Sequence, residues 1–257
     1  MATIFYFSGT GNSLSTAKEI SNKLHGKLIP IIQALSTENN YFDDIIGIVS
    51  PVYCMDLPKI VEDFLQKFEL KNPSYIFGIV TCAGADGLAL SKMKNILDKR
   101  GLNLSYGNKV ILPDNSIVFP TSEDKKNELL NNQGEVISKI FSDINNRVNN
   151  CESLKRSTRN QVLSKILKLG LNKIYKIQNK TINSEKCISC GICERICPVS
   201  NINKIHGEYM IGKNCENCFA CAHWCPQRAI SIGKFTPNDK THYTHPKITL
   251  KNILNRD

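Results

Sequence analysis

Eight of the eleven cysteines in this sequence form two identical runs near the C-terminus. Each run reads Cys-x-x-Cys-x-x-Cys-x-x-x-Cys-Pro, and the second begins 28 residues after the first. The runs contain Cys187, Cys190, Cys193, Cys197 and Pro198, and then Cys215, Cys218, Cys221, Cys225 and Pro226. Thiolates are soft ligands, and a cubane iron–sulfur cluster takes one at each of its four iron atoms. The spacing therefore predicts that residues 181–235 bind two 4Fe–4S clusters.

Zinc binding and disulfide bonding are the alternative uses of these cysteines. Two zinc sites would also take eight thiolates, but structural zinc is usually bound by paired Cys-x-x-Cys segments without a third cysteine and a trailing Cys-Pro. Disulfides need an oxidising compartment, of which the sequence gives no sign. The remaining cysteines, Cys54, Cys82 and Cys151, have no regular spacing. The pattern favours metal binding in a reducing cytoplasm.

The cysteine runs resemble those of bacterial two-cluster 4Fe–4S ferredoxins in every cysteine and in both prolines. In that family, the last cysteine of each run binds the cluster of the other run. The resemblance implies that one cluster is held by Cys187, Cys190, Cys193 and Cys225. It implies that the other is held by Cys215, Cys218, Cys221 and Cys197.

A loop rich in glycine and hydroxyl residues follows the apolar N-terminal segment. Residues 2–7 predict a strand and about 13–25 a helix, and the loop between them reads Ser8, Gly9, Thr10, Gly11, Asn12 and Ser13. Backbone N–H groups of such a loop and of the next helix N-terminus can bind an anion. The loop lacks the lysine of the Walker sequence and the three spaced glycines of the dinucleotide fingerprint. It resembles the flavodoxin phosphate loop, which implies that it binds the phosphate of FMN.

The rest of the first half alternates apolar strands with helices. Strands are predicted at residues 27–33, 44–50, 74–81 and about 108–112, with helices at about 57–67 and 87–100 and a last helix from Ser122. Continuous apolar strands between helices indicate a parallel sheet covered on both faces. The predicted fold of residues 1–150 is α/β, a flavodoxin-like doubly wound five-stranded parallel sheet.

Two further loops lie where flavodoxin-like proteins contact their flavin, because ligands of such sheets bind at the carboxyl ends of the strands. One contains Pro51, Val52 and Tyr53, and the other contains Thr81, Cys82, Ala83 and Gly84. Tyr53 offers a stacking partner for the isoalloxazine ring, and it equally fits an ordinary aromatic at a strand end. The small residues of the other loop let backbone approach a flat ring. Residues 113–121 form either a cover for the flavin edge or a surface connection.

Residues 151–180 predict a basic amphipathic connecting helix. One side of its helical wheel is apolar and includes Leu163, Ile166, Leu171 and Ile174, whereas lysines occupy the other side. Such a helix favours packing between two domains, and it is also compatible with peripheral contact to a membrane surface. In the basic tail, residues 236–257, the apolar alternation at 248–250 predicts a docked strand.

Length and charge limit the remaining possibilities. The 257 residues are enough for more than one domain. The net charge of +10 is concentrated in residues 121–180, which carry 12 basic and 6 acidic side chains. Such a charge suits an acidic protein, an anionic membrane or a nucleic acid, but no nucleic-acid-binding module is recognisable. With neither a signal peptide nor a membrane-spanning stretch in the sequence, we expect a cytoplasmic protein.

The whole sequence resembles the flavodoxin–ferredoxin fusion proteins of anaerobic prokaryotes. The resemblance implies a flavodoxin-like domain (1–150), the connecting helix (151–180), a small α+β two-cluster ferredoxin domain (181–235) and the tail (236–257). Cubanes pass single electrons, and flavins exchange one or two. We therefore expect an electron-transfer protein that joins two 4Fe–4S clusters to FMN, with external redox proteins or a small acceptor as partners and no acid–base or nucleophilic catalytic residue. The alternatives are a flavoenzyme that reduces a quinone or another small acceptor, and a non-catalytic redox sensor.

Overall fold

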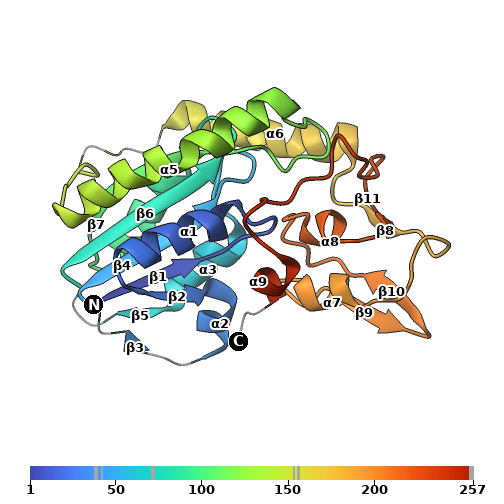
Figure 1. Ribbon diagram of the computed structural model, residues 1–257, viewed down its shortest axis with the longest axis horizontal. Coiled ribbons are helices and arrows are strands. Elements are labelled where there is room, and N and C mark those ends of the chain that lie inside the picture. Colours follow the sequence, from blue (N-terminus) through green and yellow to red (C-terminus); the bar gives the residue numbers. More distant parts are fainter. Residues whose placement is uncertain (38–39, 42, 71–72, 153, 155–156, 255–257) are drawn as a thin grey trace.

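The larger part of the molecule is a five-stranded parallel sheet (Figure 1). The computed structural model describes residues 1–37, 40–41, 43–70, 73–152, 154 and 157–254. The sheet has the order β2-β1-β4-β6-β7, and its strands are β1 (Ala2–Tyr6), β2 (Lys27–Pro30), β4 (Ile45–Pro51), β6 (Tyr75–Cys82) and β7 (Leu104–Ile111). This is the flavodoxin-like order of a doubly wound sheet. The predicted fold class is confirmed.

Helices cover both faces of this sheet, and its central strands are therefore buried almost throughout. On one face α1 (Asn12–Lys23) packs against α5 (Glu123–Asn145), and on the other α3 (Lys59–Lys67) contacts both α4 (Ala89–Asp98) and α2 (Ile31–Ser36). The prediction of a strand over 27–33 was too long. Pro30 has no N–H to continue a ladder, and the chain turns there into α2. A small parallel pair, β3 (Asn40–Tyr41) and β5 (Glu69–Leu70), was not predicted.

The smaller part of the molecule is built from two similar halves. The first contains β8 (Lys180–Ile182), α7 (Ile192–Ile196) and β9 (Ile202–Ile205), and the second contains β10 (Glu208–Ile211), α8 (Ala220–His223) and β11 (Ile230–Ile232). The strands pair antiparallel across the halves, β8 with β11 and β9 with β10. The 28-residue sequence repeat is therefore also a structural repeat with an exchange of strands.

The backbone of the cysteine loops repeats in the same way. Three pairs of residues 28 positions apart have left-handed φ values, namely Ser189 and Asn217 (54° and 57°), Gly191 and Phe219 (74° and 57°), and Ser200 and Arg228 (49° and 50°). This conformation is easy for glycine and strained for a bulky side chain such as that of Phe219. The second half keeps the same loop conformation at an energetic cost, because Phe219 stands where the first half has Gly191.

The connecting helix, α6 (Thr158–Tyr175), lies inside the predicted range. The hydroxyl of Ser164 donates to the carbonyl of Cys54 (2.8 Å), and Lys168 forms an ion pair with Asp56 (2.8 Å). The prediction of a packed apolar face is wrong for three of its members, because Leu163, Ile166 and Ile174 are 38%, 59% and 63% exposed. None of the helices in the described part of the chain combines the length and apolar character that crossing a bilayer demands.

The C-terminal tail crosses the junction between the two parts and ends in α9 (Leu250–Leu254) (Figure 1). The predicted strand at 248–250 is wrong, since Ile248 packs as a buried side chain at the entrance to that helix. The N–H of His245 donates to the carbonyl of Thr10 (2.9 Å), and its Nε2 lies 2.9 Å from Oε1 of Gln133. The hydroxyl of Tyr243 donates to Oδ1 of Asn12 (2.7 Å). The tail is thereby fixed to the start of α1 and to α5.

Lowering the pH should weaken this attachment. Burial lowers the pKa of His245 from 6.5 to about 4, so between these values the unfolded chain binds a proton that the folded chain does not. The free energy of unfolding therefore falls as the pH drops from about 6.5 to about 4. We expect His245→Gln to lose part of this pH dependence in thermal unfolding scans, whereas His206→Gln, at an exposed position, should retain it. An unchanged pH dependence in the His245 variant would contradict the prediction.

Candidate functional site

The loop between β1 and α1 has the structure of an anion-binding turn. Its left-handed residue, Gly11, has φ 104°, and the N–H of Gly11 donates to the hydroxyl oxygen of Ser8 (3.1 Å). The first turn of α1 contains no acidic residue, and its N–H groups have no partner within the helix. Ser8, Thr10 and Ser13 are all buried here. Hydroxyls, helix dipole and backbone N–H groups thus meet at one place.

This loop forms one pocket with the other two predicted loops, and we call it the first-loop pocket. The pocket is open to solvent on one side and is lined by Ser8, Gly9, Thr10, Asn12, Ser13, Pro51, Val52, Tyr53, Thr81, Cys82, Ala83, Pro113, Asp114 and Asn115. Of the thirteen residues predicted for the flavin, eleven lie in this lining, whereas Gly11 and Gly84 do not. Gly11 provides the positive φ that the turn requires, and the carbonyl of Gly84 accepts a hydrogen bond from Lys109 (3.1 Å).

The loops meet because β1, β4 and β6 are neighbours in the sheet, so that their carboxyl ends lie side by side. The hydroxyls of Ser13 and Thr81 lie 2.8 Å apart and join the first loop to the third. The amide of Asn12 donates to the carbonyl of Pro113 (2.9 Å), which brings residues 113–115 to the rim. Sequence reasoning left open whether residues 113–121 cover a flavin, and the structure places their first three residues in the pocket wall.

The lining contains one ionisable carboxyl and no lysine or arginine. Burial raises the pKa of this carboxyl, Asp114, although the N–H of Ser116 donates to its Oδ1 (2.8 Å). Burial also raises the pKa of the thiols of Cys54 and Cys82. An anionic ligand would therefore be held by hydroxyl and N–H donors, not by a cationic side chain.

Tyr53 connects this pocket to the cysteine segment. Its side chain lines the pocket, while its hydroxyl is buried and has no hydrogen-bond partner among the described residues. Burial, followed by the charges of Cys218, Glu216 and Cys215, raises the pKa of this phenol. A buried donor without a partner is rare in native proteins. It marks a position where a bound group would complete the site.

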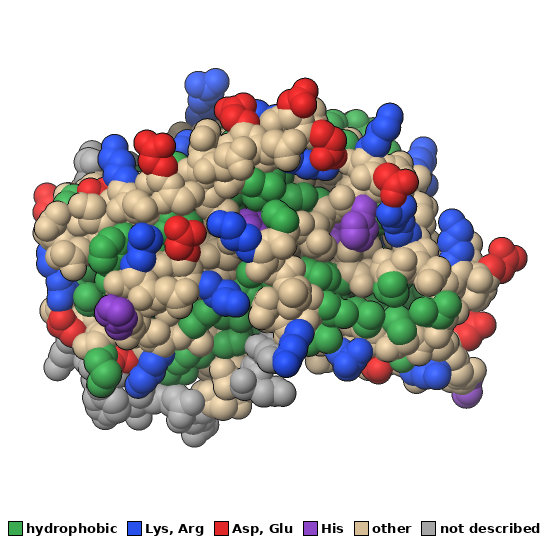
Figure 2. Space-filling model, viewed as in Figure 1, with side chains coloured by type: hydrophobic (Ala, Val, Ile, Leu, Met, Phe, Trp, Pro, Cys, Tyr) green, Lys and Arg blue, Asp and Glu red, His purple; other side chains and the backbone are tan. Residues whose placement is uncertain are grey.

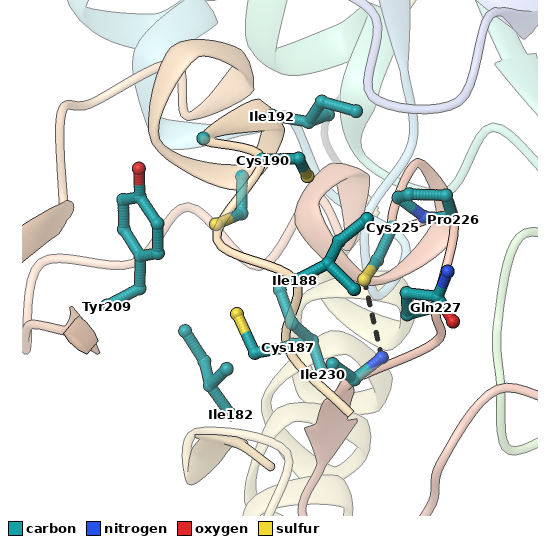
Figure 3. Close-up of a pocket in the computed structure, with 13 residues that line it drawn as sticks. Ile182, Cys187, Ile188, Cys190, Ile192, Tyr209, Cys225, Pro226, Gln227 and Ile230 are labelled. Atoms are coloured by element: carbon teal, nitrogen blue, oxygen red, sulfur yellow. Dashed lines mark hydrogen bonds between the residues drawn. The ribbon is translucent and has the colours of Figure 1, made fainter. Parts of the chain in front are cut away.

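The predicted ligands of the first cluster line another pocket, which we call the first cysteine pocket (Figure 3). Cys187, Cys190 and Cys193 come from the first run and Cys225 from the second, and Ile182, Ile188, Ile192 and Ile230 supply apolar walls. The N–H of Ala229 donates to Sγ of Cys225 (3.3 Å), which is the dashed line in Figure 3. The strand exchange between the halves brings Cys225 to the cysteines of the other run.

The predicted ligands of the second cluster line a similar pocket, which we call the second cysteine pocket. It contains Cys197 from the first run and Cys215, Cys218 and Cys221 from the second. The N–H of Asn201 donates to Sγ of Cys197 (3.2 Å), at the position equivalent to Ala229. In the parts of the chain that the structure describes, no three His, Cys, Asp or Glu side chains lie close enough together to hold a single metal ion.

The second cysteine pocket adjoins the first-loop pocket. A Cβ built on Gly9 would lie only 2.6 Å from the carbonyl oxygen of Cys218 and 3.2 Å from the Tyr53 hydroxyl. The indole N–H of Trp224 donates to the carbonyl of Gly9 (3.0 Å), and the N–H of Ile60 donates to Glu216 (3.1 Å). Gly9 thus belongs to the wall of one pocket and touches a predicted ligand of the other.

Sequence reasoning missed the residues that join the two parts. Trp224, Glu216, Tyr243 and His245 were not predicted to bind the first domain. The missed hydrogen bonds link residues more than 100 positions apart. Among these residues, only Trp224 carried a signal in the sequence, because a buried indole N–H usually finds a hydrogen-bond partner.

Comparison with known proteins identifies the cysteine segment. Residues 180–203, which hold the first run, match the 4Fe-4S binding domain family. The match indicates that the chain binds at least one 4Fe–4S cluster, and this chemistry gives it a role in electron transfer. A search of curated proteins finds no match.

Solved structures similar to the chain include two flavoproteins. A flavoprotein in complex with FMN from Lactobacillus acidophilus is 18% identical, with 42% of this chain and 91% of that chain covered and a TM-score of 0.34. The two-electron reduced flavodoxin of Megasphaera elsdenii is 18% identical, with 45% and 90% covered and a TM-score of 0.33. Both scores are low, and it is the strand order β2-β1-β4-β6-β7 that shows the flavodoxin-like fold.

Exchange of ligands between the two runs can be tested with Cys225→Ser. This variant removes a sulfur from the pocket of Cys187, Cys190 and Cys193, although Cys225 belongs to the other run. We expect the iron content to fall from about eight to about four atoms per chain. The electron paramagnetic resonance spectrum of the remaining cluster should match that of Cys190→Ser.

The matched control is Cys151→Ser, since Cys151 is buried outside both runs and the variant should keep all its iron. If the spectrum of Cys225→Ser matched that of Cys218→Ser instead, each run would bind its own cluster and the exchange would be refuted.

Proposed function

We propose that the protein is an electron-transfer protein that relays electrons between two 4Fe–4S clusters and a bound FMN. In this proposal, residues 1–150 form the FMN-binding domain, 151–180 the connection, 181–235 the two-cluster domain and 236–257 the tail, as in the flavodoxin–ferredoxin fusion family. The observation that carries the proposal is the position of Gly9, which lines the first-loop pocket and touches Cys218. This contact would place one cluster next to the flavin.

The residues of the first-loop pocket fit FMN. Ser8, Thr10 and Ser13 with the N-terminus of α1 would hold the phosphate, which needs no cationic side chain when N–H and hydroxyl donors surround it. Tyr53 and Val52 would face the ring from one loop, and the small residues of the third loop would face it from another. When bound, the flavin supplies exchange of one or two electrons.

The two cysteine sets fit cubanes in the same way. Each provides four sulfurs with apolar neighbours, as a cluster with four thiolate ligands requires. Burial raises the pKa of the Cys193 thiol to about 11, and binding of iron would release the proton of this thiol. The N–H groups of Asn201 and Ala229 donate to the two exchanged sulfurs and tune their electron density.

Figure 2 shows hydrophobic side chains gathered over α7, β9 and β10 on the face in view. Ile188 lines the first cysteine pocket and is 60% exposed, and Ile205 on β9 and Met210 on β10 are 46% and 55% exposed. We infer that external redox proteins exchange electrons with the chain here, since apolar patches of this kind mark interaction sites.

A cofactor count tests the proposal directly. Protein purified without oxygen should contain about eight irons, eight acid-labile sulfides and one FMN per chain, and stepwise reduction should reveal the order in which they accept electrons. Full clusters without flavin, even after addition of FMN, would overturn the relay and leave a ferredoxin with an attached docking domain.

The junction can be tested with Gly9→Ala. Its methyl group would lie 2.6 Å from the carbonyl oxygen of Cys218, so the two parts must move apart or distort. We expect the free energy of unfolding to fall by about 1–3 kcal/mol and electron transfer between cluster and flavin to slow in flash-reduction measurements.

The control for Gly9→Ala is Gly170→Ala on α6, where an added Cβ also meets no atom within 4 Å. This variant should be at least as stable as the wild type, because alanine favours a helix over glycine, and should keep the transfer rate of the wild type. Equal rates in the Gly9 variant and the wild type would show that the contact does not set the electron path.

A flavoenzyme that reduces a quinone or another small acceptor is the second candidate, and Asp114 favours it. Quinone reduction consumes protons as well as electrons, and Asp114 is a carboxyl in the pocket wall whose pKa burial raises. If the protein is such an enzyme, turnover with a soluble quinone should fall in Asp114→Asn. No turnover in the wild type would leave the carrier function alone.

A further inference from the structure

Helix α6 turns a stripe of polar side chains toward the protein. Asn160 donates to the carbonyl of Gly87 (3.0 Å), Ser164 donates to that of Cys54 (2.8 Å), and Lys168 pairs with Asp56 (2.8 Å). These three residues are four positions apart and form one stripe. Although burial opposes ionisation of Asp56, hydrogen bonds and charges from Lys168 and Lys92 lower its pKa, so the carboxylate stays charged and holds the helix.

The opposite stripe of α6 exposes apolar side chains. Val162, Ile166 and Leu169 occur at helical spacing and are 52%, 59% and 69% exposed. Phe119, 57% exposed, lies beside the C-terminal end of the helix, with its ring centroid 5.9 Å from that of Tyr175. A helix that packs only for stability would bury these side chains instead.

Basic side chains lie among the apolar ones. Arg159, Lys165 and Lys173 are exposed on α6, which contains no acidic residue. Residues 151–180 together carry eight basic side chains and one acidic side chain. The outward face of the helix is therefore both apolar and cationic.

We propose that α6 binds the surface of an anionic lipid bilayer and lies parallel to it. Apolar side chains would enter the headgroup region, and the lysine stems would reach along it while their ammonium groups contact lipid phosphates. An anionic bilayer complements this charge, and its fluid surface receives a convex helix without a preformed groove. Cys54 and Gly87, to which α6 is hydrogen-bonded, follow the second and third pocket loops, so docking places the pocket side of the molecule near the bilayer.

Vesicle flotation with the full-length protein tests this inference independently of any cofactor. We expect the protein to float with vesicles of phosphatidylglycerol and phosphatidylcholine at low salt, and not with phosphatidylcholine alone. Ile166→Ser with Leu169→Ser should weaken binding at least about tenfold. Lys165→Gln with Lys173→Gln should weaken it roughly fivefold per lysine and reduce its salt dependence.

The matched control replaces Ile205 and Met210 by serine, since both are comparably exposed on the β9–β10 hairpin. This variant should bind vesicles like the wild type. Absence of binding to anionic vesicles would overturn the proposal. So would concentration-dependent dimerisation that the Ile166 and Leu169 variant abolishes in sedimentation experiments, because a second copy of the chain would then cover the stripe.

Discussion

The close approach of the Gly9 backbone to Cys218 is the contact on which the arrangement of the two parts depends. A side chain at position 9 would meet the carbonyl oxygen of Cys218 at 2.6 Å, so only glycine fits without displacement. The indole N–H of Trp224 also holds this backbone by donating to the Gly9 carbonyl (3.0 Å). Because Gly9 also belongs to the anion-binding loop, the geometry of that loop and the position of the cysteine segment are set together.

Two further segments hold this junction in place. Nε2 of His223, on α8, lies 2.8 Å from the carbonyl of Asn115, and its Nδ1 accepts a hydrogen bond from the N–H of Tyr243 (3.1 Å). Burial lowers the pKa of His223 to about 4, so the neutral ring can accept at one nitrogen and donate at the other. One buried side chain thus joins the cysteine segment, the pocket rim and the C-terminal tail, which explains why an irregular tail is well packed.

The sequence was informative where chemistry is local and uninformative where it depends on distant partners. The spacing of the cysteines places three of them in one turn, and apolar strands followed by small residues indicate the loops of a parallel sheet. The orientation of α6 could not be predicted in this way, because a helical wheel shows only that two sides differ. Asp56 decides which side faces inward by pairing with Lys168, more than 100 residues away. The tail was misassigned for the same reason, since short apolar alternation fits a strand until a neighbour such as Gly11 provides a place for Ile248.

The two cysteine pockets share their ligand pattern but differ in their surroundings. Cys190 in the first pocket is exposed, whereas the equivalent residue of the second run, Cys218, is buried together with Cys221. Burial and hydrogen bonds to sulfur are the main means by which a protein separates the potentials of chemically identical clusters. The pocket that contains Cys190 has apolar walls that include Ile182, Ile188 and Ile230, whereas the buried one adjoins Gly9 and the first-loop pocket. The two halves of the repeat therefore differ in their surroundings, because the contacts to Gly9, Ile60 and Asn115 of the larger part come from the second half.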